Sequence, residues 1–338
     1  MFVNWAHYLV PKISFFLSFV LNQVFVCLIH SNKNVLFGNY RYLLYFFAVF
    51  NLCASAADLL IPVTVFCYRY AFVTLVVDGP FALSSEPAEA FIAFRASFLS
   101  GTYGILNVHF IFRYLALKSN NIIKFYFMPY GLLLSVIYVL FHMSVWAMID
   151  YFCLHSASEM RDYIRIPFRN LHNESIDNIN LVAGLFSEAS PEIVQRSWAG
   201  IVLLTVIASY SMVLYFVLGY KIITGLNIES VTMSHQTTQM QKQLFKALTI
   251  QTIIPICVSF MPCSFSFYGA ALNIGFMNWV YWLSAVAVSM FPFLDPLAII
   301  LLLPALRRRL PNPIRKYRGN SVSVVPNQIS EASFGRVQ

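Results

Sequence analysis

Seven long apolar stretches constrain the fold of this 338-residue chain more than any other feature. They cover residues 9–30, 42–66, 90–114, 125–149, 198–222, 247–270 and 278–303. A bilayer core about 30 Å thick needs about 20 mostly apolar residues in each spanning helix. Because backbone amides in lipid must be satisfied within the segment, each stretch is predicted to be a helix. The sequence therefore predicts an all-α membrane protein, a bundle of seven transmembrane helices.

The composition fits a membrane protein and excludes several other classes. Only 11% of the residues are charged and 59% are hydrophobic, whereas a soluble domain carries about 25% charged residues. A soluble enzyme, a nucleic-acid-binding protein and a disordered chain are therefore excluded. The sequence lacks the H-E-x-x-H, G-x-S-x-G and Walker motifs, and its histidines do not have the spacing of metal ligands. We expect no catalytic residues, no metal or other cofactor, and no nucleic-acid partner.

The distribution of basic residues predicts which side of the membrane each terminus occupies. Seven spans place the two termini on opposite sides. With the amino terminus outside, fifteen of the 22 basic residues lie on the cytoplasmic side, as the positive-inside rule requires. The opposite orientation would translocate the basic cluster Arg307–Arg309. We therefore predict an extracellular amino terminus and a cytoplasmic carboxyl terminus.

With this orientation, the chain is predicted to consist of three parts. Residues 1–303 are predicted to form the seven-transmembrane domain, with one long extracellular loop at about residues 150–197. The loop holds the single N-x-S/T sequon, so Asn173 is predicted to be glycosylated. Residues 304–318 form a basic juxtamembrane segment, in which each cation beside an anionic leaflet contributes about 1 kcal/mol. We expect this segment to bind anionic inner-leaflet lipids, and residues 319–338 to be a disordered cytoplasmic tail.

Charged residues inside the spans are costly and usually face the bundle interior. Asp58 lies about 24 Å from the inner end of its span, and Asp295 about 12 Å from the inner end of its own. This difference in depth argues against a direct pair between the two carboxylates. Arg95 lies in the outer third of the neighbouring span, and a buried charge is stabilised by a partner. We therefore predict an Asp58–Arg95 contact; the alternative is that Arg95 reaches the outer headgroups.

A proline and an aromatic cluster mark the last two spans. Pro296 follows Asp295 inside the last span, where a proline removes an amide donor and kinks the helix. The pair is either a hinge that opens the cytoplasmic face or a static kink. Aromatic side chains near the outer half of these spans either line a ligand pocket or form the interfacial belt. They are Tyr268, Trp279, Tyr281 and Trp282.

Several short blocks, in order along the chain, resemble the nematode class r (str-type) seven-transmembrane chemoreceptors. They are Gly38–Leu43, Asp58–Pro62, His109–Tyr114, Gln241–Leu248 with Gln251, Thr252, Ile254 and Pro255, and then Pro292, Asp295–Leu297, Arg307 and Arg308. The resemblance implies a G-protein-coupled receptor that detects a small odorant or a peptide and signals to a heterotrimeric G protein. It also implies a location in the plasma membrane, in the cilia of sensory neurons.

The same resemblance assigns roles at the cytoplasmic ends of the spans. Coupling to the G protein and switching between states fall to His109, Arg113, Tyr114, Gln241, Lys242 and Lys246. Arg113 would pack inward in one state and meet the G protein in the other. The alternative, from the position of the residue alone, is that Arg113 anchors its helix at the membrane interface.

The cysteines depart from the pattern of the family. Many members carry a cysteine at the outer end of the third span, and residues 91–101 have none. Of the six cysteines, only Cys67 and Cys153 lie near the outer face, where oxidation occurs. They either form a disulfide or remain two free thiols that behave as small apolar residues.

Two other classes of membrane protein compete with the receptor. A transporter would show internal repeats and broken helices around a midplane site, and no repeat is visible. A ligand-gated channel of the inverted seven-span type would place its amino terminus inside, against the distribution of basic residues. The receptor is therefore the leading prediction.

Overall fold

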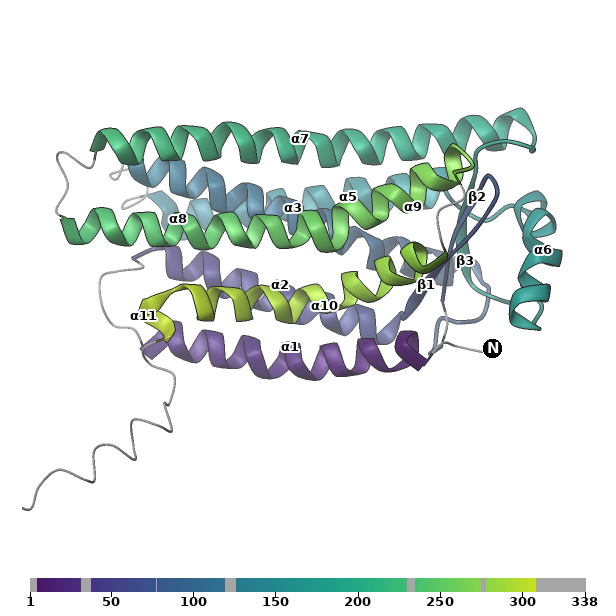
Figure 1. Cartoon of the computed structure of the whole chain (residues 1–338), viewed down its shortest axis with the longest axis horizontal. Coiled ribbons are helices and arrows are strands. Elements are labelled where there is room, and N and C mark those ends of the chain that lie inside the picture. Colours follow the sequence, from purple (N-terminus) through teal and green to yellow (C-terminus); the bar gives the residue numbers. More distant parts are fainter. Residues whose placement is uncertain are drawn as a thin grey trace, which may run out of the picture.

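A bundle of long helices forms the body of the computed structural model, which describes residues 5–31, 38–76, 78–118, 126–229, 235–274 and 278–307 (Figure 1). The rods of the bundle are α1 (Trp5–Ser31), α2 (Tyr40–Leu60), α3 (Glu86–Lys118), α5 (Leu132–Cys153), α7 (Pro191–Glu229), α8 (His235–Pro255) continued by α9 (Met261–Ala271), and α10 (Asn278–Leu302). Single π-helical turns, η1 (Phe127–Gly131) and η2 (Ile256–Phe260), precede α5 and join α8 to α9, and the short α11 (Pro304–Arg307) follows α10.

Six of these rods are apolar and long enough to cross a membrane, and α3 is the seventh rod. Its 33 residues span about 50 Å. It packs against α2, α5 and α7 and buries polar side chains, among them Asn107, His109 and Arg113. Because α3 lies inside the bundle, its polar residues contact other helices instead of lipid. The predicted seven-helix bundle is confirmed.

The second predicted span ends earlier than expected. Residues 42–66 were predicted to form one helix, but α2 ends at Leu60. Ile61 leaves the helical conformation, and its amide still donates to the carbonyl of Ala57. Pro62 follows and has no amide to continue the ladder of hydrogen bonds. The remaining apolar residues of the stretch form a strand.

A three-stranded antiparallel sheet, absent from the all-α prediction, covers one end of the bundle. Its strands are β1 (Val63–Tyr68), β2 (Ala71–Val76) and β3 (Leu181–Leu185), in the order β1-β2-β3. Phe72 on β2 packs toward the bundle, whereas its neighbour Val73 packs toward the opposite face. Both faces are covered by apolar residues, so the strands show no polar alternation. Periodicity alone cannot distinguish such a run from a buried helix.

The long loop predicted at residues 150–197 is largely ordered secondary structure. It contains α6 (Ser158–His172) and β3, and α7 begins inside it. Met160, Ile164 and Phe168 recur every four residues and form the buried stripe of α6, which covers the outer face of the sheet. Asn173 ends this helix in a left-handed conformation with φ of 57° and is exposed. We call this end of the bundle the sheet end.

The two ends of the described chain lie at opposite ends of the bundle. Trp5 begins α1 at the sheet end, and Arg307 closes α11 at the other end, as Figure 1 shows. We call that other end the Arg113 end. Most of the predicted basic segment at 304–318 and the predicted tail at 319–338 lie outside the described residues.

Candidate functional site

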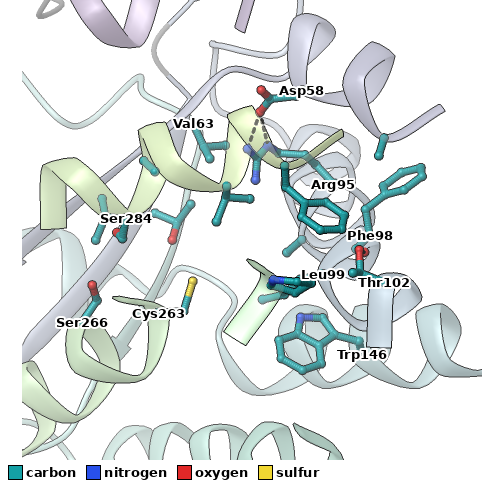
Figure 2. A pocket seen from close by; sticks show the side chains of 18 of the residues that line it. Asp58, Val63, Arg95, Phe98, Leu99, Thr102, Trp146, Cys263, Ser266 and Ser284 are labelled. Atoms are coloured by element: carbon teal, nitrogen blue, oxygen red, sulfur yellow. Dashed lines mark hydrogen bonds and ion pairs between the residues drawn. The ribbon is translucent and has the colours of Figure 1, made fainter. Parts of the chain in front are cut away.

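A cavity of about 130 Å³ lies inside the bundle at the sheet end. Residues of α2, α3, α5, β1, β2, α8, α9 and α10 line it, so five of the seven rods contribute. Most of the lining is aliphatic or aromatic. The polar exceptions are Asp58, Thr74, Arg95, Thr102, Cys263, Ser266 and Ser284. Figure 2 shows Ser266, Cys263 and Ser284 across the pocket from Phe98, Thr102 and Trp146.

Asp58 and Arg95 form an ion pair at the edge of this cavity, as predicted (Figure 2). The Nε of Arg95 donates to Oδ1 of Asp58 at 3.0 Å, and its Nη2 donates to the same oxygen. The Asp58 and Arg95 side chains are only 7% and 12% exposed. The other carboxylate oxygen, Asp58 Oδ2, is buried and has no hydrogen-bond partner. The pair is therefore electrically neutral but leaves one acceptor unused.

The direction of the helices explains why this pair forms. α2 runs toward the sheet end, and α3 starts there and runs away from it, so residues near the end of one meet residues near the start of the other. Asp58 lies in the last turn of α2, and Arg95 lies nine residues after the first residue of α3. Depth counted along the helices was therefore sufficient to predict the contact.

The sequence missed the aromatic residues that line the cavity. One signal was present: Phe98, Leu99 and Thr102 follow Arg95 by three, four and seven residues and share its helix face. All three line the cavity. Others, such as Phe72, belong to the sheet and were not predicted.

Of the four predicted pocket residues, only the side chain of Tyr268 is described, and Tyr268 does not line this cavity. Tyr268 lines an adjoining cavity of about 30 Å³ between α3, α5, α7 and α9, which shares Leu99, Trp146, Cys263 and Phe267 with the first. The Tyr268 hydroxyl lies 2.8 Å from Thr205 Oγ1. The side chains of Trp279, Tyr281 and Trp282 lie outside the described residues.

Cys67 and Cys153 are free thiols in the structure, so the disulfide does not form. Cys67 packs beside Phe72 and Phe267 where the sheet meets the bundle. Cys153 packs in a different apolar cluster with Leu154. The two thiols behave as small apolar side chains, which is the alternative that the sequence left open.

Arg161 of α6 contacts both the segment that follows α6 and the start of α3. Its Nη1 donates to the carbonyls of Ile176 and Ile179, both at 3.0 Å. Its Nη2 lies 3.8 Å from Oε1 of Glu89, in the first turns of α3. The covering elements of the sheet end are therefore tied to the helix that carries Arg95.

At the Arg113 end, three of the sequence blocks meet around one tyrosine. Arg113 is 5% exposed, and its guanidinium lies 3.7 Å from the centre of the Tyr40 ring. Its Nη1 donates to Oε1 of Gln241 at 3.2 Å. The Tyr40 hydroxyl lies 2.8 Å from Nδ1 of His109. Arg113 thus packs inward, although its Nε and Nη2 are buried without a partner.

Asp295 is fully buried beside this cluster. Neither of its carboxylate oxygens has a hydrogen-bond partner. The side chain of Gln251 lies next to it. Arg113 and Asp295 therefore both bury hydrogen-bonding atoms that have no partner at this end of the bundle.

The helix α10 continues through Pro296, and a neighbouring helix compensates for the missing amide. In an uninterrupted helix the amide of residue 296 would donate to the carbonyl of Pro292. In this structure Asn22 Nδ2 of α1 donates to that carbonyl at 3.2 Å, and Ser18 Oγ donates to it at 3.4 Å. Such repair by polar side chains is how spanning helices tolerate proline.

The other predicted coupling residues surround the Arg113 end. Tyr114 is half-buried, with Nζ of Lys118 and of Lys221 at 5.9 and 5.7 Å from its ring centre. Lys242 and Lys246 are exposed on α8. No group of three or more histidine, cysteine, aspartate or glutamate side chains suited to a metal occurs in the described part of the chain.

Comparison with known proteins identifies the family. The family described as serpentine type 7TM GPCR chemoreceptor Srj matches residues 1–310. Serpentine receptor class J-38 of Caenorhabditis elegans is 35% identical over 312 residues, which cover 91% of this chain and 93% of that protein. Serpentine receptor class r-10 of the same organism is 26% identical over 304 residues, 88% of this chain and 87% of its own.

A further relative is G-protein coupled receptor str-33 of Caenorhabditis elegans, 23% identical over 260 residues and 75% of each chain. The resemblance to nematode serpentine chemoreceptors is confirmed, and the class J relative matches at higher identity than the class r and str receptors that the sequence blocks suggested. This is a family of receptors and not of enzymes. The chain is a chemosensory receptor that belongs to the Srj family of serpentine seven-transmembrane G-protein-coupled receptors.

Proposed function

We propose that this receptor binds a small organic ligand in the cavity at the sheet end and passes the signal along α3 to a heterotrimeric G protein at the Arg113 end. One observation carries the proposal: α3 supplies both the arginine of the cavity, Arg95, and the buried arginine of the opposite end, Arg113. They are 18 residues apart, about 27 Å along the helix.

The sheet end faces outward in this proposal. The predicted glycosylation site, Asn173, is exposed there. Basic residues gather at the Arg113 end, where Lys118, Lys242 and Lys246 are exposed, as expected for a cytoplasmic face beside anionic lipids. The receptor acts in the plasma membrane of sensory neurons, in their cilia.

The Arg113 end offers two arrangements of one arginine. In the structure Arg113 stacks on Tyr40 and bonds to Gln241. In the other arrangement it leaves Gln241 and pairs with Asp295 or with the G protein, which would satisfy its unused Nε and Nη2. A ligand changes the balance only if it binds one arrangement better than the other. We propose that α3 has a different position in each arrangement, so that the ligand binds the two arrangements with different affinities.

The experiment uses cells that express the receptor with a heterotrimeric G protein and a second-messenger readout. The probes are small alcohols, aldehydes, acids and amines, applied one at a time. Ala96→Trp fills the cavity, because Ala96 lines it, and Leu140→Trp is the matched control on an exposed face of α5. We expect a response that Ala96→Trp abolishes and Leu140→Trp preserves at equal surface expression.

Two results would contradict the proposal. A response that survives Ala96→Trp would place the ligand outside this cavity. A ligand-dependent current or flux in cells without the G protein would favour the channel or the transporter over the receptor.

A further inference from the structure

We infer that the cavity selects an uncharged ligand: a mostly apolar molecule about the size of one benzene ring that carries a single hydroxyl group. The inference rests on the proposed function, because it specifies the ligand of the same cavity. Three features of the lining carry it, namely the volume, the balance of charge and one unused acceptor.

The volume and the apolar lining limit the size and polarity of the ligand. An enclosed apolar cavity of about 150 Å³ holds a benzene molecule, and this one has about 130 Å³. Its walls include Val63, Phe98, Trp146 and Val288. A ring with one small substituent matches this volume and this lining.

The balance of charge excludes ions. Among the described residues that line the cavity, Asp58 and Arg95 are the only aspartate, glutamate, lysine or arginine side chains. They neutralise each other through two hydrogen bonds to one oxygen. A carboxylate or an ammonium ion would therefore lose its hydration without gaining an unpaired counter-charge, and a buried uncompensated charge is strongly unfavourable.

The unused acceptor favours a hydroxyl group. Asp58 Oδ2 is buried, lacks a hydrogen-bond partner and belongs to a residue of the lining. A buried acceptor without a donor carries an uncompensated desolvation cost, which a ligand donor removes. A hydroxyl is a donor that brings no charge, so a small shift of the carboxylate lets the ligand satisfy this oxygen and leaves the ion pair intact.

The test measures binding of four probes of nearly equal size to the purified full-length receptor in nanodiscs. They are benzyl alcohol, toluene, benzoate and benzylammonium. Binding is read from ligand-observed NMR, and the Ala96→Trp receptor supplies the background from partition into lipid. We expect benzyl alcohol to bind a few-fold more tightly than toluene, and more than about 100-fold more tightly than either ion.

Charge variants test the same reasoning from the side of the protein. Asp58→Asn leaves an unpaired guanidinium and is expected to shift the preference to benzoate. Arg95→Gln leaves an unpaired carboxylate and is expected to shift the preference to benzylammonium. Either single variant can lower the yield of folded receptor, so the neutral double variant Asp58→Asn/Arg95→Gln is measured beside them. It is expected to keep the preference for benzyl alcohol over both ions.

The outcomes separate the inference from the proposed function. If benzoate or benzylammonium binds the unmodified receptor as tightly as benzyl alcohol, or if toluene does, the inference is wrong and the cavity remains a ligand site. If no probe binds the unmodified receptor or any charge variant above the Ala96→Trp background, the inference and the proposed cavity fail together.

Discussion

The repair of α10 at Pro296 leads to a quantitative prediction about stability. Asn22 Nδ2 donates to the carbonyl of Pro292 because Pro296 has no amide to do so. In the Pro296→Ala variant the amide returns and can donate to that carbonyl. The side chain of Asn22 should then matter less. The prediction is a coupling between two residues on helices that lie at opposite ends of the sequence.

The magnitude follows from the hydrogen bonds. Replacing Asn22 with leucine removes a donor from a buried carbonyl but also removes Asn22 Oδ1, a buried acceptor without a partner. The effect of the single variant therefore mixes a loss with a gain. A double-mutant cycle isolates the coupling. Because bonds between spanning helices contribute about 0.6 kcal/mol on average and about 1.7 at most, we expect a coupling of about 0.6 to 1.5 kcal/mol.

The assay is reversible unfolding of four receptors in one detergent: the unmodified chain, Asn22→Leu, Pro296→Ala and the double variant. Asn22→Leu should destabilise the unmodified receptor more than it destabilises the Pro296→Ala receptor. Ser18 Oγ also donates to this carbonyl, at 3.4 Å, and remains as a donor when Asn22 is replaced. We therefore expect the coupling free energy to be moderate. Free energies that add within about 0.3 kcal/mol would refute the argument.

Three further predictions concern other parts of the chain. Gly101→Ala should destabilise by about 1–3 kcal/mol in thermal unfolding, because its Cβ would lie 2.7 Å from Phe50, whereas Gly219→Ala has its nearest neighbour at 3.6 Å and should be tolerated. Asn173→Gln should remove the mass shift on glycosidase treatment; no shift in the unmodified receptor would contradict the predicted glycosylation. Asp295→Leu should raise the unfolding midpoint, since it removes two buried oxygens that have no hydrogen-bond partner; a lower midpoint would indicate a missed partner.

The fold was predictable where one physical constraint dominates. The bilayer requires helices of known length, so the spans followed from hydropathy alone. Depth along α2 and α3 then sufficed to pair Asp58 with Arg95. The sheet was not predictable in this way, because β1 is apolar on both faces and continues the apolar run of α2.

The site was less predictable than the fold. The lining of the cavity comes from helices and strands far apart in the sequence, and an apolar helix does not reveal which face turns inward. The donation from Asn22 to Pro292 joins residues 270 positions apart, and no local pattern marks it. A charged residue is the useful exception: once Arg95 is known to face inward, residues three, four and seven positions later face inward too.

The geometry of α3 explains how one helix can serve both ends of the receptor. Arg95 and Arg113 are 18 residues apart, which is about five full turns, so both side chains leave the same face of the helix. Arg95 meets the cavity and Asp58, and Arg113 meets Tyr40 and Gln241. A ligand that shifts Arg95 along or around the helix axis therefore moves Arg113 in the same direction. Because Arg113 holds one hydrogen bond and two unused buried donors, a small shift is enough to exchange its partners.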